Sequence, residues 1–375
     1  MATVLSGLRL VTADDVVSDA VLVLDGDRIV GVRRGSPPAD ALDLGGALVM
    51  AGFVDQHSHG GGGGDFFSGD ATQVQQAIDA HLAHGTTSIV ASLVTATTED
   101  LLAQLASLHP FIADGQLAGV HLEGPWISAD QCGAHDINLL RAPDPAELDV
   151  LLEAGGRDIK MVTLAPELDG GVEATAQLVD SGVVVAVGHT SADLEVTRAA
   201  IDAGATVATH LLNRMPALHK RHPGPVFALM DDPRVVVELI ADGVHLHPEM
   251  MRFVIDHVGP GRAAVVTDAM GAAGAAEGRY KIGQLDVDVA DGQARLVSNG
   301  ALAGSVLTMD TALRTLVFSC DQDLPAATQM LSSTPARAMG LADRGRIAAG
   351  MRADLVVLDD DLNVTRVMRA GEWVV

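Results

Sequence analysis

The chain of 375 residues is poor in cysteine and in aromatic side chains. Only Cys132 and Cys320 occur, which is too few for a disulfide framework in a chain of this length. The first residues do not form a basic segment followed by an apolar signal core, so we expect a reducing, cytoplasmic environment. Aromatic residues make up 3% of the chain and apolar residues 48%, so the core must consist mainly of Ala, Val and Leu.

Positive charge and long apolar runs are also scarce. Lys and Arg number 24 against 49 Asp and Glu, which gives a formal net charge of −25. A field of this sign repels nucleic acids and anionic membrane surfaces, so we expect neither as a partner. Charged residues, glycine or proline interrupt every apolar stretch before it reaches the ~20 residues that a membrane-spanning helix needs.

Eight short apolar runs that end near polar residues alternate with helical patterns through the middle of the chain. This alternation predicts parallel strands in βαβ units, and eight such strands close an α/β barrel of roughly 250 residues. Active sites of such barrels lie at the carboxyl ends of the strands. The runs are residues 47–54, 86–94, 117–123, 159–166, 183–189, 205–210, 235–241 and 263–268.

The two ends of the chain have the pattern of short β-strands. Residues 20–32 form two β-branched runs around an Asp-Gly-Asp turn, which is a hairpin signature, and residues 346–375 have a similar pattern. Neither end has enough apolar residues to fold alone, and pairing would cover the strand edges of both. We therefore predict a small β-sandwich domain from residues 1–48 and 344–375, attached to a (β/α)8 barrel over residues 49–343.

Histidines and a glutamate occupy several of the predicted strand ends. His57 and His59 follow the first run on alternate positions, so their imidazoles point to the same side and can share one cation. Glu123, His189 and His210 end three later runs, and one carboxylate with two imidazoles would satisfy a catalytic divalent ion. A single strand-end histidine can also serve only as a hydrogen-bonding residue, but the recurrence favours a metal site.

Asp268 ends the last apolar run and precedes Ala-Met-Gly, a stretch that lets a substrate approach closely. A carboxylate at this place can take a proton from water and later return one to a leaving group, which are the two halves of hydrolysis. Asp268 is therefore the candidate general base. The alternative is an aspartate that only caps the next helix.

Six motifs in chain order resemble those of the amidohydrolase superfamily, and within it the deacetylases that act on N-acetylglucosamine 6-phosphate. The resemblance covers almost the whole chain, including the split β domain. It implies metal-dependent hydrolysis that yields glucosamine 6-phosphate and acetate. The motifs are His-Leu-Glu-Gly-Pro-Trp at 121–126, Gly-His-Thr-Ser at 188–191, Thr-His-Leu-Leu-Asn-Arg-Met-Pro at 209–216, Asp-Gly-Val-His at 242–245, Val-Thr-Asp-Ala at 266–269 and Leu-Ala-Gly-Ser at 302–305.

The resemblance implies that the strand-end glutamate and the two later histidines hold the catalytic metal, with Asp268 as base and then acid. Zinc is the first expectation, and the same ligands accept iron, manganese or cobalt. A second ion is expected between Glu123 and the pair His57 and His59, because this chain retains both histidines. Lys160 lies at the start of its strand and cannot bridge two metals.

The resemblance also implies contacts with a phosphorylated amino sugar. His135 and His245 would contact the sugar or the amide oxygen. Arg221, in the basic stretch 219–224, would bind the phosphate in a neighbouring subunit's site, so we expect a homodimer. Asn213 matches the other phosphate-side position, whereas many relatives have alanine where this chain has an arginine. The remaining substrate positions are Arg214, Ala134, Leu302, Ala303 and Gly304.

Other functions remain open at this point. The substrate could be the galactosamine epimer, or the chain could be a cyclic-amide hydrolase of the same superfamily. A barrel without catalytic activity is a further alternative, and the intact set of strand-end ligands with Asp268 counts against it. Cys132 lies in the loop before His135 and is expected to line the pocket at most.

Overall fold

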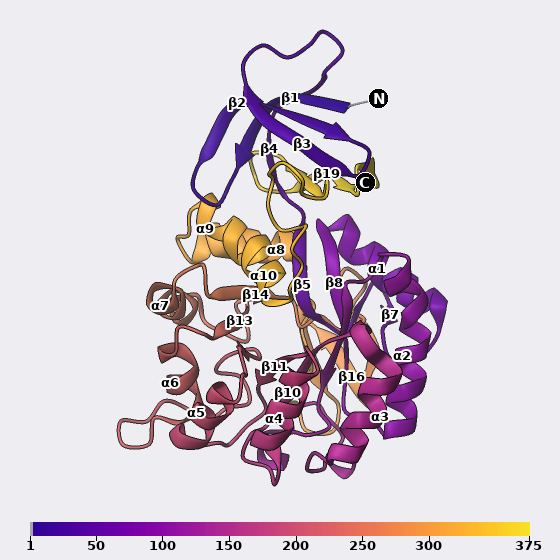
Figure 1. Ribbon diagram of the computed structural model, residues 1–375, viewed down its shortest axis with the longest axis vertical. Helices are drawn as coiled ribbons and strands as arrows, with labels where there is room; N and C mark the ends of the chain where they lie inside the picture. The colour runs from indigo at the N-terminus through magenta and orange to yellow at the C-terminus, as the bar shows by residue number, and fades with distance from the viewer. Residues whose placement is uncertain (1–2) are drawn as a thin grey trace.

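The structure, a computed structural model, describes residues 3–375. A barrel forms the larger body, and a smaller sheet lies above it in the view of Figure 1. Strands from both ends of the chain form this smaller sheet, so the two ends lie together. No helix in the described part of the chain is long and apolar enough to cross a membrane.

Eight parallel strands form the barrel sheet, which confirms the predicted fold class. Their order is β14-β13-β12-β11-β10-β9-β8-β5. A bridge between Ser58 and Ala269 joins the end of β5 to the segment after β14. A bond from the Asp268 backbone N–H to the His57 carbonyl, 2.8 Å, reinforces this closure. The strands are β5 (Phe53–Ser58), β8 (Thr86–Leu93), β9 (Gly119–Glu123), β10 (Ile159–Leu164), β11 (Val184–Val187), β12 (Val207–Ala208), β13 (Val236–Ile240) and β14 (Ala263–Val266).

Helices alternate with these strands and cover the outside of the barrel (Figure 1). Several begin at capping carboxylates: Asp70, Asp144 and Asp193 accept bonds from backbone N–H groups in the first turns of α1, α3 and α5. The helices are α1 (Ala71–Ala83), α2 (Thr98–Ala113), α3 (Pro145–Gly155), α4 (Gly171–Asp180), α5 (Leu194–Asp202), α6 (Gly224–Asp231), α7 (Pro248–Val258), α8 (Met309–Arg314), α9 (Leu324–Thr328) and α10 (Thr334–Ala338).

Shorter helical turns occur in the connections. η4 (Thr315–Ser319) and η5 (Gln329–Ser333) are π-helical turns, and η5 makes α9 and α10 one continuous helical segment. The 3-10 turns are η1 (Ala129–Gln131), η2 (Ile137–Leu139) and η3 (Gly156–Asp158).

The smaller sheet contains seven strands from both ends of the chain, as the sequence predicts. The hairpin of β2 and β3 is present, and a bridge from Arg28 to Arg352 joins β3 to the segment before β18, so the sheet folds over its own core. Leu22, Val49 and Leu355 are buried together in that core. The strands are β1 (Thr3–Val11), β2 (Val16–Asp25), β3 (Arg28–Arg34), β4 (Leu42–Ala51), β18 (Leu355–Leu358), β19 (Val364–Arg369) and β20 (Glu372–Trp373).

One expected strand is wrong. The apolar run 47–54 is not a single barrel strand, because its first part completes β4 of the small sheet and only its last part begins β5. Gly52 separates the two, and a Cβ atom there would lie 2.1 Å from the Thr87 hydroxyl oxygen. The residues on both sides of Gly52 are buried, so the apolar pattern continues across the boundary. The limits of the two domains, placed at residues 48 and 344, remain a prediction.

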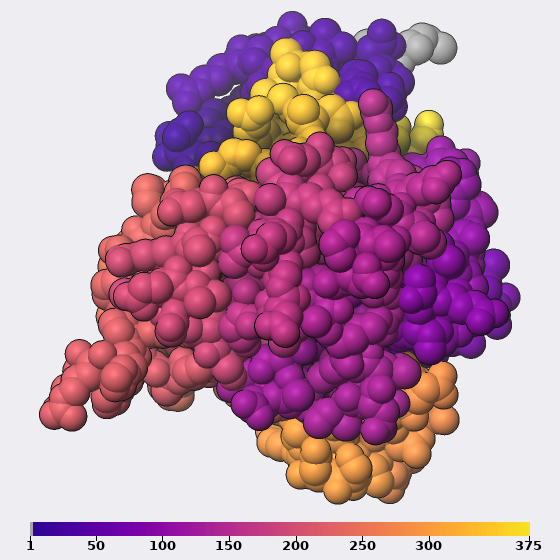
Figure 2. Space-filling view, turned by 60° about the horizontal axis from the view of Figure 1, so that its bottom comes forward, coloured from indigo at the N-terminus to yellow at the C-terminus, as the bar shows by residue number. Residues whose placement is uncertain are grey.

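A three-stranded antiparallel sheet follows the barrel and has no counterpart in the sequence predictions. It consists of β15 (Gly278–Ile282), β16 (Leu285–Ala290) and β17 (Gln293–Leu296), and it forms the protrusion at the bottom of Figure 2. A short ladder of β6 (Gly60–Gly61) and β7 (Gly64–Asp65) lies just beyond β5. Ile282 and Ala303 are buried in the same apolar cluster, which packs the added sheet against the barrel.

Candidate metal centre and substrate pocket

Five residues predicted as ligands meet at the carboxyl end of the barrel. β5 contains the first histidine of the pair, and β9 ends at the glutamate. The other histidines lie one or two residues after the ends of β5, β11 and β12. All five are buried. They form two groups in which the ligand atoms lie within 4.8 Å of one another, namely His57, His59 and Glu123, and Glu123, His189 and His210. The glutamate is therefore common to both groups, while its role as a ligand remains a proposal.

The hydrogen bonds of the first group fit a bound cation. The Nδ1 atom of His57 lies 3.1 Å from Oε2 of Glu238, and Nδ1 of His59 lies 3.2 Å from the carbonyl oxygen of Ser92. An acceptor at Nδ1 places the imidazole proton there and leaves a lone pair on Nε2. The two Nε2 atoms are nevertheless only 3.2 Å apart. Two facing lone pairs repel each other, and so do two facing N–H groups, so this pair of imidazoles fits a metal ion between them.

The second group shows the same arrangement. The Nδ1 atom of His189 donates to the carbonyl oxygen of Gln131 at 2.7 Å, so its Nε2 carries a lone pair. That Nε2 lies 3.0 Å from Nε2 of His210, and both lie within 3.2 Å of Oε1 of Glu123. A carboxylate oxygen and imidazole nitrogens that converge on one point form the donor set of a divalent metal site.

The charges in the site favour a cation as well. Burial raises the pKa of Glu123, but His57 and the other imidazoles around it hold that pKa well below its usual value. Burial lowers the pKa of His59, but bonds to Asp268 and Glu123 raise it to about 9, so without a metal ion this imidazole holds a proton where a cation would bind. Burial holds the pKa of His189 down at about 4, so this imidazole is neutral and ready to bind a metal at neutral pH.

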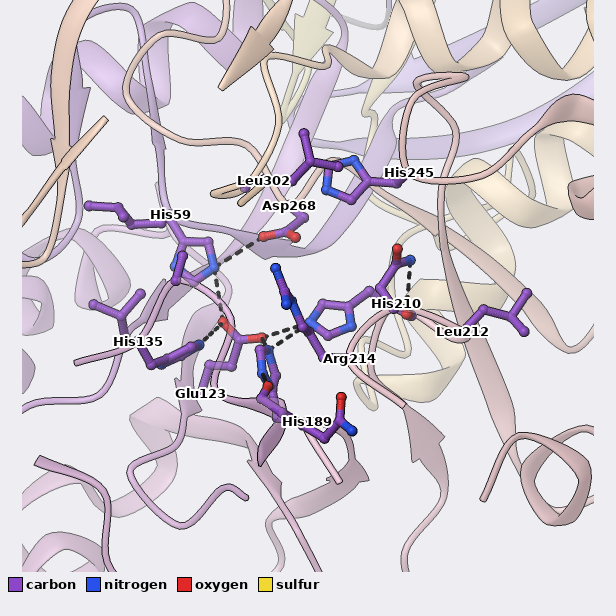
Figure 3. A pocket seen from close by; sticks show the side chains of 16 residues that line it. His59, Glu123, His135, His189, His210, Leu212, Arg214, His245, Asp268 and Leu302 are labelled. Atoms are coloured by element: carbon purple, nitrogen blue, oxygen red, sulfur yellow. Dashed lines mark hydrogen bonds and ion pairs between the residues drawn. The ribbon is translucent and has the colours of Figure 1, made fainter. Parts of the chain in front are cut away.

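Asp268 lies on the His57 and His59 side of the centre. Its Oδ1 is 3.2 Å from Nε2 of His59 (Figure 3). The same oxygen is 3.6 Å from Nε2 of His57. Burial raises the pKa of this carboxyl group, but the two histidines lower it below its usual value. The carboxylate is therefore ionised at neutral pH and able to accept a proton.

The backbone at the strand ends is strained. His189, His210 and Asp268 have φ angles of 47°, 26° and 48°, and Leu212 and Arg214 nearby have 76° and 53°. Residues with a Cβ atom rarely adopt this left-handed region, and each costs about 1–2 kcal/mol. Such strain concentrates at functional sites, where surrounding contacts hold side chains in one required direction.

A cavity of about 270 Å³ opens onto these groups (Figure 3). His245 lines it and bonds Asp242 through Nδ1 at 2.7 Å. Burial lowers the pKa of His245, but the bond to Asp242 raises it above its usual value, so this imidazole is a good hydrogen-bond donor. Predicted substrate residues that line the cavity are Ala134, His135, Asn213, Arg214, His245, Leu302 and Gly304.

His135 lies between the cavity and the centre. Its Nδ1 is 2.8 Å from the Thr95 hydroxyl, and its Nε2 is 3.5 Å from Oε2 of Glu123. Its ring contacts the ring of His189 edge to face, with centroids 4.7 Å apart. The side chain thus contacts the carboxylate directly, although the sequence placed it only in a loop that contacts the substrate.

Three predicted residues do not line the cavity of this chain. Arg221 is exposed on the connection between β12 and α6, which extends away from the barrel at the lower left of Figure 2. Ala303 is buried in the apolar cluster beneath the added sheet. Cys132, expected to line the pocket at most, is half-buried in the neighbouring loop and does not line the described cavity.

Glu238, which supports the centre from β13, was not predicted from the sequence. This fully buried carboxylate bonds Nδ1 of His57, accepts the backbone N–H of His210 at 3.1 Å and accepts Nε2 of Gln56 at 2.8 Å. It therefore contacts residues of both groups. A signal was present, because a single charged residue inside the apolar run 235–241 must be paired when it is buried.

The sequence pattern of the amidohydrolase family matches residues 48–374. A mutant of N-acetyl-D-glucosamine-6-phosphate deacetylase from Mycobacterium smegmatis, solved with N-acetyl-D-glucosamine-6-phosphate, is 48% identical, with a TM-score of 0.97 over 100% of this chain and 99% of that one. N-acetylgalactosamine-6-phosphate deacetylase of Escherichia coli O157:H7 is 35% identical over 99% of both chains. N-acetylglucosamine-6-phosphate deacetylase of Bos taurus is 36% identical over 88% of this chain and 84% of that protein. The chain belongs to the amidohydrolase family.

Proposed function

We propose that this protein hydrolyses the acetamido group of N-acetylglucosamine 6-phosphate, which releases acetate and glucosamine 6-phosphate. One observation carries the proposal: a buried carboxylate, Glu123, joins two imidazole pairs beside the ionised Asp268, at the base of a cavity that contains Arg214. This combination supports hydrolysis of an amide in a molecule that also carries an anionic group. The similar deacetylases named above support the choice of the amino sugar.

The proposed ligands of the first ion are Glu123, His189 and His210, and those of a second ion are His57 and His59 with the same glutamate. A divalent metal bound there would polarise the amide carbonyl and lower the pKa of water to roughly 7. The imidazole and carboxylate ligands suit zinc first and also accept iron, manganese or cobalt. Each Nδ1 bond described above orients one of these ligands before any ion binds.

Asp268 is the proposed general base and acid. Its carboxylate removes a proton from the attacking water while the water oxygen bonds to the acyl carbon. It then delivers that proton to the amine nitrogen as the carbon–nitrogen bond breaks, so that acetate and a free amine leave. His135 and His245 lie on the cavity wall, where their N–H groups donate to the amide oxygen and to the sugar.

The phosphate is proposed to bind where Asn213 and Arg214 line the cavity. The guanidinium group offers two parallel donors to phosphate oxygens, and the amide offers another. We propose that Arg221 reaches the neighbouring subunit's site. Its connection between β12 and α6 extends outward from the barrel, which supports this proposal. The functional unit is thus proposed to be a homodimer, which size-exclusion chromatography with light scattering will show as a particle of twice the chain mass.

The galactosamine epimer is the second candidate substrate. The reason to test it is the 35% identity over 99% of both chains with a deacetylase of that name. Steady-state kinetics with both epimers will decide between them, and a higher kcat/KM for the galactosamine epimer would reverse the proposed preference. Equal or greater activity on a dihydropyrimidine would instead identify a cyclic-amide hydrolase.

The decisive experiment measures acetate release together with the metal content of the same sample. We expect the purified protein to release acetate from N-acetylglucosamine 6-phosphate. This activity should be lost after a chelator has removed the metal thoroughly, and it should return when zinc is added. Full activity in metal-free protein would overturn the mechanism. Absence of acetate release from fully metal-loaded protein would overturn the proposed function.

A further inference from the structure

A second cavity, of about 510 Å³, lies near the amino ends of the barrel strands, away from the metal centre. The helical segment of η5 and α10 forms one wall, and the loop 339–346 that leads toward the small sheet forms the other. α10 lies between the barrel and the small sheet in Figure 1. This cavity shares no lining residue with the cavity that opens onto Asp268.

Three arginines line this second cavity, and none of its lining residues is acidic. Arg337 and Arg344 have partial partners: Arg337 donates to the carbonyl of Gly261, and Arg344 donates to the Ser88 hydroxyl at 3.1 Å. Arg344 also lies 3.2 Å from a carboxylate oxygen of Asp343, outside the cavity lining. Arg346 is exposed, and its side chain makes no hydrogen bond or ion pair with the residues that the structure describes.

The loop geometry that brings these arginines together depends on a glycine. Gly345 lies between Arg344 and Arg346 and has a φ angle of 80°. A Cβ atom at this position would lie 2.7 Å from both the Ala336 Cβ atom and the Ser332 carbonyl oxygen. Only glycine therefore lets the loop lie this close to α10, with an arginine on either side facing one cavity.

The charge pattern indicates an anion as the occupant. Arg337, Arg344 and Arg346 are three of only 24 basic residues in a chain whose net charge is −25, and like charges gathered in one cavity repel one another. An anion removes this repulsion. A guanidinium group presents parallel N–H donors that match phosphate oxygens, and hydroxyl and amide groups of Ser333 and Gln329 line the same space.

We propose that this arginine-lined cavity binds a small phosphate monoester. Its volume is in the range of sites for small molecules, roughly 300–1,000 Å³. The lining contains no histidine, cysteine or carboxylate that could act as a nucleophile or general base, so the cavity is a binding site without chemistry of its own. The proposal does not depend on the proposed reaction, because the two cavities are separate.

Binding of glucosamine 6-phosphate, inorganic phosphate and glucosamine is to be measured by titration calorimetry on three forms of the full chain. These are the wild type, the Arg344→Gln/Arg346→Gln variant and the Arg33→Gln/Arg34→Gln variant. The last removes the same charge from two exposed arginines of β3 that line no described cavity. The wild type and the β3 variant are expected to bind one more glucosamine 6-phosphate per chain than Arg344→Gln/Arg346→Gln, the cavity variant. Any binding that remains at the cavity of that variant should be weaker by roughly tenfold or more.

Equal stoichiometry in the cavity variant and the β3 variant would overturn the proposal. If the ligand is a phosphate monoester, glucosamine 6-phosphate should bind the cavity more tightly than inorganic phosphate does. Equal affinities would overturn the assignment of the ligand as a monoester. Glucosamine without phosphate should bind all three forms alike. Arg346→Gln alone provides a second test if the double variant does not fold, since the Arg346 side chain has no partner among residues 3–375.

Discussion

The two ends of the same eight strands bury opposite kinds of side chains. At the carboxyl end, imidazoles and carboxylates converge on Glu123 with almost no exposure. At the amino end, the interior is apolar: Val90, Met161 and Val207 pack against Met339 from the loop after α10. Burying polar and ionisable groups opposes folding unless they are paired, whereas burying apolar groups drives it. The amino end therefore stabilises the barrel, and the carboxyl end holds the groups that carry out the chemistry.

The largest expected effect is at Asp268. Replacement of Asp268 with Asn keeps the shape of the side chain and removes its ability to accept a proton. Turnover should fall by a factor on the order of 10³ or more, because general acid and base catalysis would both be lost. Acetate release measures this effect, and metal analysis should show wild-type content. Wild-type turnover in fully metal-loaded Asp268→Asn protein would show that another group is the base.

Replacing both His57 and His59 with Asn removes the histidines of one ligand group at the carboxyl end and leaves the other group intact. Metal content should fall toward one ion per chain while some activity remains, since Glu123, His189 and His210 still form a complete set of three ligands. Metal analysis after dialysis measures the content. A variant that retains two ions per chain would contradict the assignment of the pair to a second site.

The opposite effect is expected at the amino end. Met161 is fully buried in the apolar cluster, and truncation to Ala should lower the free energy of unfolding by about 2–5 kcal/mol through lost contacts and a cavity. The kcat at low temperature should not change. Urea denaturation measures the loss, and Met250→Ala is the matched control, since Met250 is 40% exposed and should cost far less. A large fall in kcat for Met161→Ala would remove the contrast between the two ends.

A substitution at Glu238 tests whether a residue that orients a ligand contributes to metal affinity. Glu238→Gln removes the negative charge and replaces one of the two acceptor oxygens with an NH2 group. The bonds from His57, His210 and Gln56 can then no longer all be kept, which weakens the orientation of His57. Metal affinity should fall roughly 10–100-fold, measured by competition with a chelator. The exposed Glu249→Gln substitution is the control. Unchanged metal affinity would mean that Glu238 serves only to pair the strands.

The smallest expected effect concerns pH and the buried His81, which lies near the carboxyl end without facing the cavity. Burial lowers its pKa to about 4, and its Nε2 bonds the Gly60 carbonyl at 2.9 Å. In the unfolded chain His81 takes up a proton near pH 6.5, whereas in the folded chain it does so only near pH 4. Stability from this residue is thus complete above that pH and decreases as pH falls, by roughly 2 kcal/mol at pH 5.

Chemical denaturation at pH 7 and pH 5 measures this loss for the wild type and for His81→Gln. The variant should lose less stability between the two pH values than the wild type does. His219→Gln, at an exposed position, should behave as the wild type. Identical pH dependence in the wild type and His81→Gln would show that the folded protein protonates His81 as readily as the unfolded chain does.

Much of the fold was predictable because it depends on local patterns. Alternating apolar runs predicted the eight strands, and the Asp-Gly-Asp turn predicted the hairpin of β2 and β3. The boundary inside residues 47–54 was missed, because hydropathy does not change where one buried strand follows another. The added sheet β15–β17 was missed as well, since its strands are half-exposed and short.

The sequence by itself determined which residue types end the strands, and hence that imidazoles and carboxylates gather at one end of a barrel. Only the tertiary structure decided which atoms face one another. The contacts of Glu238 with His57 and His210, and of Asp268 with His59, join residues far apart in the chain. Barrel closure and strand register determine these distances, because a shift of one residue along a strand turns each side chain to the opposite face.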